Sequence, residues 1–266
     1  MMLTEKNFDV VGKMEAVSLE EMSAVSLMNR IDTKYLTTAA KLGLVLEDAY
    51  RAGYRICEIE GQRRLSYASV YYDTPDLQMF TAHRNGKKTR QKVRVRTYLV
   101  DGQTFLEIKR KNNRGRTKKK RIRIPSDSVM GFAAIPEASD FLRKQSCWGP
   151  DDISPETTTD FSRFTLVNPS MTERITMDMD VRFRNFRSGR ETSLEDLVII
   201  EIKQDGRMES QMRRILLDHR IFPYRMSKYC MAVTLTDPQA RPGRFIEKVR
   251  YIEKLTGYKL YSRHND

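Results

Sequence analysis

The sequence predicts an α+β fold, in which about eight antiparallel strands close into a β-barrel with a charged interior and helices pack outside. Three observations support this prediction. Segments such as residues 93–98 alternate apolar with charged residues, so each would form a strand with one apolar and one charged face. Asp101-Gly102 is a hairpin-turn signature between two such segments. Amphipathic helical segments follow towards the C-terminus, and closure of the barrel would leave no strand edge exposed.

The N-terminal half is expected to mix helices and strands. Ser18 and Glu21 form a capping box ahead of a short helix that runs through Asn29. The Tyr- and Val-rich residues 66–72 indicate a strand. The other elements expected here are a strand at Tyr35 and Leu36, a helix over about 38–50, a turn at 73–76 with a helix through about Ala82, strands over 92–100, 103–110 and about 117–124, and partly helical residues over 126–148.

In the C-terminal half, residues 149–159 indicate a loop, and strands are expected over 160–167, 173–183 and 197–203. In the strand 173–183, Ile175, Met177, Met179, Val181 and Phe183 are predicted to share one apolar face. No repeat or linker divides the chain, so we expect one domain over 1–266 with a core at about 30–235. The expected helices cover about 207–219, 226–236 and 245–255, the last in a C-terminal helical extension at 238–266 that could cap the barrel or form an oligomer surface.

Composition narrows the possible partners. Among 266 residues, 48 are basic and 35 acidic, and the net charge of +13 favours a polyanion such as nucleic acid, anionic lipid, nucleotide or polyphosphate. The three cysteines form no CxxC motif, which argues against a disulfide framework or zinc site and favours reduced thiols in the cytoplasm. No run of 18 apolar residues exists, and the N-terminus lacks the apolar core of a signal peptide.

Charged residues two positions apart share a strand face. Arginine forks bind phosphate oxygens, and glutamate is a ligand for Mg²⁺ or Mn²⁺ beside phosphates. The alternative is a solvated face on which arginine and glutamate pair across the sheet. For the whole set we favour a ligand-binding surface. The pairs are Arg94 with Arg96, Glu107 with Lys109, Arg121 with Arg123, and Glu201 with Lys203.

Two further sets of charges are open to more than one interpretation. The basic run 110–121 is either an electrostatic funnel or a solvated loop, with Lys120 and Arg121 the members most relevant to a ligand. Asp178 and Asp180 either hold a metal or pair with arginines, and we favour pairing. The sequence shows no RNA-recognition motif or KH loop and no aromatic residues beside the strand arginines, so nucleic acid is not expected as a partner.

Eight short motifs follow one another from about Arg30 to Leu235. In this order they resemble the catalytic domain of the vacuolar transporter chaperone (VTC) family, the polyphosphate polymerases, within the triphosphate tunnel metalloenzymes of the CYTH-like superfamily. One such motif is weak evidence, whereas eight in order are specific. The motifs are Arg30-Ile31-Asp32-Thr33-Lys34-Tyr35, Tyr71-Tyr72-Asp73-Thr74, Arg94-Val95-Arg96-Thr97-Tyr98, Phe105-Leu106-Glu107-Ile108-Lys109, Phe161-Ser162-Arg163-Phe164, Arg174-Ile175-Thr176-Met177-Asp178, Glu201-Ile202-Lys203 and Ser227-Lys228-Tyr229.

The resemblance implies an antiparallel tunnel that binds the phosphates of ATP and a growing polyphosphate chain. It implies Glu201 as the ligand of a divalent metal, Mn²⁺ or Mg²⁺, with Lys203 and Lys120 as weaker candidates for phosphate binding. The phosphate ligands that it implies are Lys34, Arg94, Arg96, Lys109, Arg163, Arg174 and Lys228.

The resemblance also shapes the functional hypotheses. Related triphosphatases and adenylate cyclases open with Glu-x-Glu-x-Lys, whereas this chain reads Arg30-Ile31-Asp32-Thr33-Lys34. We therefore expect an ATP-dependent polyphosphate polymerase. The alternatives are a metal-dependent inorganic or nucleoside triphosphatase and a non-catalytic polyanion-binding module. Eukaryotic relatives add membrane helices and an inositol-phosphate-sensing domain; their absence here suggests a free-standing bacterial version, whose membrane partner, if it has one, is encoded separately.

Overall fold

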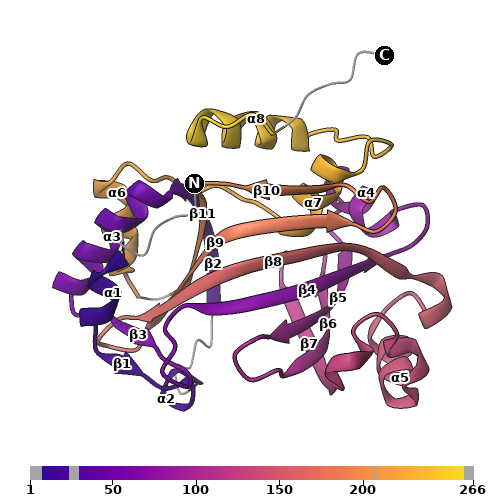
Figure 1. Cartoon of the computed structure of the whole chain (residues 1–266), viewed down its shortest axis with the longest axis horizontal. Coiled ribbons are helices and arrows are strands. Elements are labelled where there is room, and N and C mark those ends of the chain that lie inside the picture. The colour runs from indigo at the N-terminus through magenta and orange to yellow at the C-terminus, as the bar shows by residue number, and fades with distance from the viewer. Residues whose placement is uncertain (1–7, 24–29, 207, 261–266) are drawn as a thin grey trace.

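The protein is described by a computed structural model that covers residues 8–23, 30–206 and 208–260. Its centre is a curled antiparallel sheet whose main path has the order β2-β11-β9-β8-β4-β5-β6-β7 (Figure 1). The strands of this path are β2 (Arg30–Thr38), β4 (Leu65–Asp73), β5 (Arg90–Tyr98), β6 (Thr104–Lys111), β7 (Thr117–Ile124), β8 (Ser154–Val167), β9 (Glu173–Asn185) and β11 (Leu197–Asp205).

Short strands and helices complete the architecture. The strands β1 (Ala16–Val17), β3 (Arg55–Cys57) and β10 (Glu191–Leu194) pair beside the main path. Single turns of 3₁₀ helix cover Ser126–Ser128, Phe132–Ala134 and Pro150–Asp152. The α-helices are α1 (Val10–Lys13), α2 (Leu19–Ser23), α3 (Ala39–Arg51), α4 (Gln78–Arg84), α5 (Pro136–Gln145), α6 (Gln211–Asp218), α7 (Lys228–Thr236) and α8 (Phe245–Thr256).

The predicted α+β class, with an antiparallel sheet of about eight strands, is confirmed. The sheet curls but does not close. In the described residues no ladder joins its end strands β2 and β7, so the sheet forms a half-barrel. Strand β7 carries Lys118, Lys119 and Lys120, and nearly its whole length is exposed. A lysine-rich edge repels a further strand, which explains why the expected full closure is not reached.

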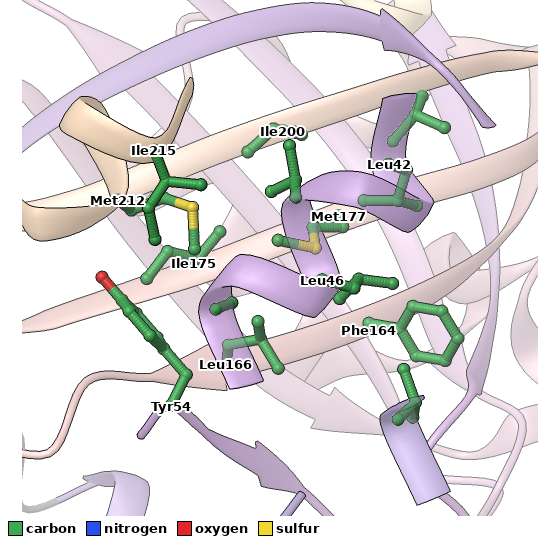
Figure 2. Close-up of a cluster of buried hydrophobic side chains, with 14 of the residues drawn as sticks. Leu42, Leu46, Tyr54, Phe164, Leu166, Ile175, Met177, Ile200, Met212 and Ile215 are labelled. Carbon is green, nitrogen blue, oxygen red and sulfur yellow. The ribbon is translucent and has the colours of Figure 1, made fainter. Parts of the chain in front are cut away.

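Helices α1, α3 and α6 cover the convex face of β2, β11, β9 and β8. The buried residues of α3 are spaced at Leu42, Val45, Leu46 and Ala49, which is the apolar stripe of an amphipathic helix. They pack in one cluster with strand residues such as Met177 and with residues of α6 (Figure 2). The apolar strand faces are thus buried outward, so the opposite, charged faces line the concave side.

Helix α7 is the exception to the expected packing of helices outside. Its Met231 and Ala232 share a buried cluster with Val181 and Phe183 of β9 and with residues of α8. Val181 and Phe183 reach this cluster because β9 contains a β-bulge next to Asp180, whose φ is +54°. The predicted single apolar face of β9 is therefore wrong: Met177 and Met179 face α3, whereas Val181 and Phe183 face α7.

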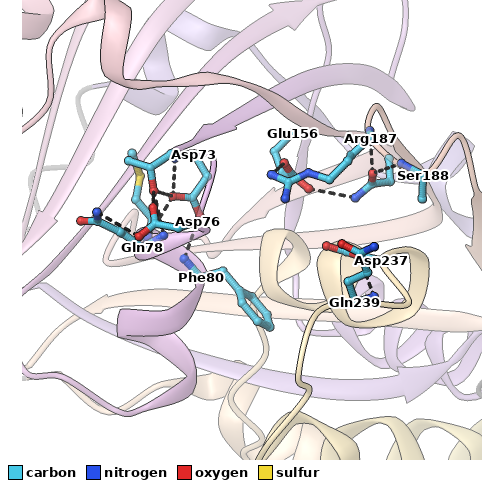
Figure 3. A network of polar contacts seen from close by, with 12 residues as sticks. Asp73, Asp76, Gln78, Phe80, Glu156, Arg187, Ser188, Asp237 and Gln239 are labelled. Carbon is cyan, nitrogen blue, oxygen red and sulfur yellow. Dashed lines mark hydrogen bonds and ion pairs between the residues drawn. The ribbon is translucent and has the colours of Figure 1, made fainter.

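Asp73 ties α7 to α4 at the same end of the sheet. Its carboxylate accepts hydrogen bonds from the backbone N–H groups of Met79 and Phe80, 2.9 Å each (Figure 3). It also accepts one from the Tyr229 hydroxyl. It therefore satisfies donors at the start of α4 that no helix carbonyl can reach. This contact fixes the N-terminal part of α7 against the concave face.

Two other predictions from the sequence, the capping box at Ser18 and the loop over 149–159, had different outcomes. The capping box is confirmed, because Ser18 N donates to Glu21 Oε2 at 2.8 Å and Glu21 N donates to Ser18 Oγ at 3.1 Å. Residues 24–29, over which that helix was expected to continue, and residues 261–266 lie outside the described residues. The expected loop over 149–159 is wrong in part, because β8 already begins at Ser154. Its β-branched threonines at 157–159 have high strand propensity.

Candidate active site

The charged residues predicted from strand alternation gather on the concave face. On β11, Glu201 lies opposite Lys34 of β2, and Lys203 lies opposite Arg174 of β9. Across β5 and β6, Arg94 lies opposite Glu107. Directly opposed residues project from the same face of a sheet. Strands β2, β11, β9, β5 and β6 therefore contribute charged side chains to the concave surface.

Each of three carboxylates on this surface is held by two cations. Glu201 contacts Lys34 at 2.9 Å and Lys203 at 2.7 Å. Asp178 accepts hydrogen bonds from Arg163 Nε at 2.5 Å and Nη2 at 3.0 Å, and it also pairs with Lys228. The third is Glu107, which pairs with Arg94 Nε at 2.8 Å and with Lys119 Nζ at 3.0 Å.

These pairs keep the carboxylates ionised. Burial by itself would raise the pKa of all three, but the neighbouring cations outweigh it. The pKa of Glu201 falls well below its ordinary value because of Lys203 and Lys34. The pKa of Glu107 is lowered by the cations around it, Arg94 first, and that of Asp178 by Arg163 and Lys228. A carboxylate with such a low pKa is a weak proton acceptor, so none of the three is suited to act as a general base.

Curling of the sheet brings its distant strands together. Four strands separate β11 from β6 along the path, yet the charge of Glu201 acts on the pKa of Lys109. Lys109 has a pKa well below its ordinary value, because Arg94 repels its charge, burial disfavours that charge, and Arg96 repels it further. A bound polyanion would relieve this repulsion.

An aromatic pair forms part of the concave surface. The rings of Tyr67 and Phe161 stack with centroids 5.2 Å apart. The guanidinium carbons of Arg96 and Arg163 lie 5.3 and 5.2 Å from the Phe161 centroid, and Lys228 Nζ lies 4.3 Å from it. The expectation that aromatics are absent beside the strand arginines is therefore wrong. Such contacts hold the cations in place while leaving hydrogen-bond donors for a ligand.

Two groups on this surface titrate near neutrality. Burial opposes ionisation of the Tyr71 hydroxyl, but Arg94, Arg96 and Lys92 outweigh it and lower the pKa of Tyr71 to about 8. Burial also lowers the pKa of Lys228 to about 8, despite the attraction of Asp178. Lys228 is the first residue of α7, whose N-cap Ser227 accepts a hydrogen bond from Lys92 at 2.7 Å.

Comparison with known proteins places this surface in a family context. The model of the VTC domain matches residues 29–236. The chain belongs to the VTC domain family. The resemblance seen in the sequence is thereby confirmed over nearly the same residues. No curated protein matches the chain.

Solved structures similar to this VTC domain were also found, at low sequence identity. A candidate adenylyl cyclase from Hippeastrum, described as having a dominant triphosphatase activity, is 13% identical over 76% of this chain and 94% of its own, with a TM-score of 0.49. A candidate adenylate cyclase from Bacillus halodurans is 14% identical over 75% and 96%, with a TM-score of 0.47. A third, from Vibrio parahaemolyticus, is 11% identical over 77% and 99%, with a TM-score of 0.45.

The VTC domain brings together nearly all the residues singled out in the sequence. Lys120 is not among them: it lies opposite Ile108, on the convex face of β7, and is exposed. Its neighbours Lys119 and Arg121 occupy the concave face instead, opposite Lys109 and Glu107. The residues placed on the concave surface are Lys34, Arg94, Arg96, Lys109, Arg163, Arg174, Glu201, Lys203 and Lys228.

Sequence reasoning missed several members of this surface. Lys92 lies two residues before Arg94, so alternation alone would have found it. Lys119 lies two residues before Arg121, so alternation would have found it as well. Tyr71 gave no such signal, because its position depends on the pairing of β4 with β5. Asp178 and Asp180 pair with Arg163 and Arg64, as expected from the sequence.

The acidic residues limit how a divalent metal could be held. In residues 8–23, 30–206 and 208–260, no group of three or more His, Cys, Asp or Glu side chains is arranged as a metal site. Glu201 offers one carboxylate between two lysines. Mg²⁺ is often bound through one or two carboxylates together with substrate phosphates. The residues therefore fit a metal that arrives with a triphosphate, and they do not fit one held by protein ligands alone.

Within the part of the chain that the structure describes, the helices are too short or too polar for any of them to traverse a lipid bilayer.

Proposed function

We propose that this protein is an ATP-dependent polyphosphate polymerase, which transfers the γ-phosphoryl group of ATP to a growing polyphosphate chain. The observation that carries the proposal is the gathering of cations from several strands on the concave face, where Arg94 and Arg96 repel the charge of Lys109 and lower its pKa. A surface in this state gains free energy when a polyanion binds. The residues proposed to bind phosphate are Lys34, Arg94, Arg96, Lys109, Arg163, Arg174, Lys203 and Lys228.

In the proposed reaction, a terminal phosphate oxygen of the chain attacks the γ-phosphorus in line. The new phosphorus–oxygen bond forms as the bond to the β-phosphate oxygen breaks, and ADP leaves with the electron pair. Phosphoryl transfer needs mainly positioning and charge neutralisation from the protein. Arg163 and Arg94 are suited to this role, because carboxylates and aromatic rings already fix their guanidinium groups.

The paired carboxylates favour transfer to phosphate over transfer to water. Attack by water is assisted by a group that accepts its proton, and Glu107, Asp178 and Glu201 all have lowered pKa values. A terminal phosphate is already ionised at neutral pH and needs no such base. Glu201 would hold Mn²⁺ or Mg²⁺, and the metal, when bound, would neutralise charge on the transferred phosphate.

The activity test is incubation of the pure protein with ATP and Mn²⁺, followed by gel analysis of phosphate chains and measurement of ADP. A polymerase yields ADP and long chains in proportion. Orthophosphate without chains would show a triphosphatase, and anion binding without turnover would show a polyanion-binding module. Either result overturns the proposal.

The metal role of Glu201 has its own test. Glu201→Ala should lower turnover by about 100-fold, a loss of about 2.7 kcal/mol of transition-state stabilisation. The matched control is Glu195→Ala, which removes an exposed glutamate of the preceding turn and should leave turnover unchanged. Anion binding by Glu201→Ala should persist or strengthen, since a negative charge has been removed.

We also propose a cytoplasmic location. ATP is the substrate in this proposal, and Cys57, Cys147 and Cys230 are all free thiols.

A further inference from the structure

A basic pocket lies on the convex side of the sheet, away from the concave surface. It is a cavity of about 760 Å³ over the convex face of β5, β6 and β7, between α4 and the end of α5. Its lining includes cations of β6 and β7 together with apolar residues. The residues on which the argument depends are Arg110, Lys118, Lys120, Ile108, Gln145 and Trp148.

The register of β6 and β7 explains why cations gather there. Arg110 lies directly opposite Lys118, and in the next row on the same face Ile108 lies opposite Lys120. Like charges placed directly opposite repel each other. Among the described residues, no ion pair joins Arg110, Lys118 or Lys120 to a carboxylate. The convex end of this hairpin therefore carries exposed positive charge that no carboxylate of the described residues neutralises and that would attract an anionic ligand.

The opposite wall of the pocket carries Trp148 and is held in place. Gln91 is buried, and its side-chain oxygen accepts hydrogen bonds from Ser146 Oγ at 3.1 Å and from Cys147 N at 3.3 Å. Ser146 Oγ in turn accepts a hydrogen bond from Trp148 N at 3.1 Å. This network fixes the segment that presents Trp148 beside Ile108. The pocket thus joins a positioned aromatic surface to an uncompensated group of cations.

We propose that this pocket binds a nucleotide, with its base against Trp148 and its phosphates on Arg110, Lys118 and Lys120. An aromatic side chain offers a stacking surface to any base, and the amide of Gln145 can meet a base edge. Polyphosphate alone would make no stacking contact with Trp148. The site is separate from the concave surface, since the pleat directs Arg110 and Lys109 to opposite faces of β6. The proposal does not depend on polymerase activity.

The test uses the intrinsic fluorescence of Trp148, the one tryptophan of the chain. ADP is titrated into the wild-type protein, into the double variant Arg110→Ala/Lys118→Ala, and into Arg163→Ala, which alters only the concave surface. We expect saturable quenching in the wild type and in Arg163→Ala. The double variant should bind ADP at least about tenfold more weakly, because two charge-assisted contacts to phosphate are lost.

Equilibrium dialysis with labelled ADP in the Arg163→Ala background provides the second readout. Adding Arg110→Ala and Lys118→Ala should remove the ADP that this variant still binds. The proposal is overturned if those substitutions leave ADP binding unchanged, or if tripolyphosphate quenches Trp148 as strongly as ADP, which would show a site for phosphate without a base. Cooperative thermal unfolding of the double variant, at a temperature no lower than that of the wild type, confirms that its fold is intact.

Discussion

The concave and convex faces of β5, β6 and β7 both carry arginine and lysine, but the two faces differ in whether these cations are paired with a carboxylate. On the concave face, Arg94 and Lys119 both pair with Glu107, whose side chain is 0% exposed. On the convex face, Arg110, Lys118 and Lys120 are exposed and have no carboxylate partner within the described residues. Cations paired with a buried carboxylate keep a fixed geometry, whereas exposed, unpaired cations contribute a field that salt screens. The first arrangement suits chemistry at one phosphorus atom, and the second suits adaptable binding.

The largest difference between the two faces should appear in stability. Glu107→Ala leaves Arg94 buried without its carboxylate, so we expect the free energy of unfolding to fall by about 3–5 kcal/mol in urea denaturation. The matched control is Glu191→Ala, which breaks the exposed pair with Arg184 at 3.4 Å and should cost less than about 1 kcal/mol. Equal losses in the two variants would show that Glu107 is no more than a surface partner.

The next largest effect concerns affinity for a triphosphate. Arg163→Ala removes a guanidinium that is fixed by Asp178 and stacked near Phe161, so the Kd for tripolyphosphate should rise by about 100-fold in calorimetry. Arg182→Ala, on the exposed convex side of β9, is the control and should change Kd by no more than about twofold. A similar Kd for both variants would contradict the assignment of phosphate binding to the concave face.

A smaller effect should appear with pH. As the pH rises through about 8, Lys228 loses its positive charge and Tyr71 gains a negative one, so the concave face becomes less cationic. Affinity for tripolyphosphate should therefore fall about tenfold above that pH. Tyr71→Phe removes one of the two titrations and should reduce the fall. A flat profile up to pH 10 in the wild type would refute both pKa assignments.

The same two groups affect stability in the opposite direction. Their ordinary pKa values are 10.5 for lysine and 10.0 for tyrosine, both above the folded values of about 8. Between these limits the unfolded chain binds more protons than the folded one. The contribution of Lys228 and Tyr71 to stability therefore rises with pH across that interval, while affinity for the anion falls.

The smallest effect is expected on the convex face. Arg110→Ala/Lys118→Ala removes a directly opposed like-charge pair, so the free energy of unfolding should increase by about 0.5 kcal/mol at low salt. The increase should shrink in high salt, because exposed charges are screened. A loss of stability would instead show that these cations have stabilising partners.

Local signals predicted the elements that depend on neighbouring residues. The strand over 117–124 was predicted with the bounds that β7 has, and Asp101-Gly102 turns the chain between β5 and β6 with Gly102 at φ +67°. Alternation also placed Arg94 with Arg96 and Glu201 with Lys203 correctly on shared faces. These features follow from pleat and turn geometry, which a few consecutive residues specify.

Other features depended on contacts between distant parts of the chain. Nothing near Asp180 in the sequence indicates a bulge, and the assignment of Lys119 rather than Lys120 to the concave face follows from the register of β7 on β6. The pairing of Ser154 and Pro155 with β4 likewise turns an apparent loop into strand. Register is a property of two strands together, so one strand's residues do not determine it.

In strands without a bulge, such as β5 and β11, the sequence by itself determined which side chains share a face, and through its motifs it determined the VTC family. Only the tertiary structure decided that the cationic faces meet, that α7 packs against the concave side, and that Glu107, Asp178 and Glu201 each lie between two cations. The physical reason is range: side-chain alternation is fixed by backbone geometry within a strand, whereas the curl of the sheet and the position of α7 arise from packing among segments far apart in the chain.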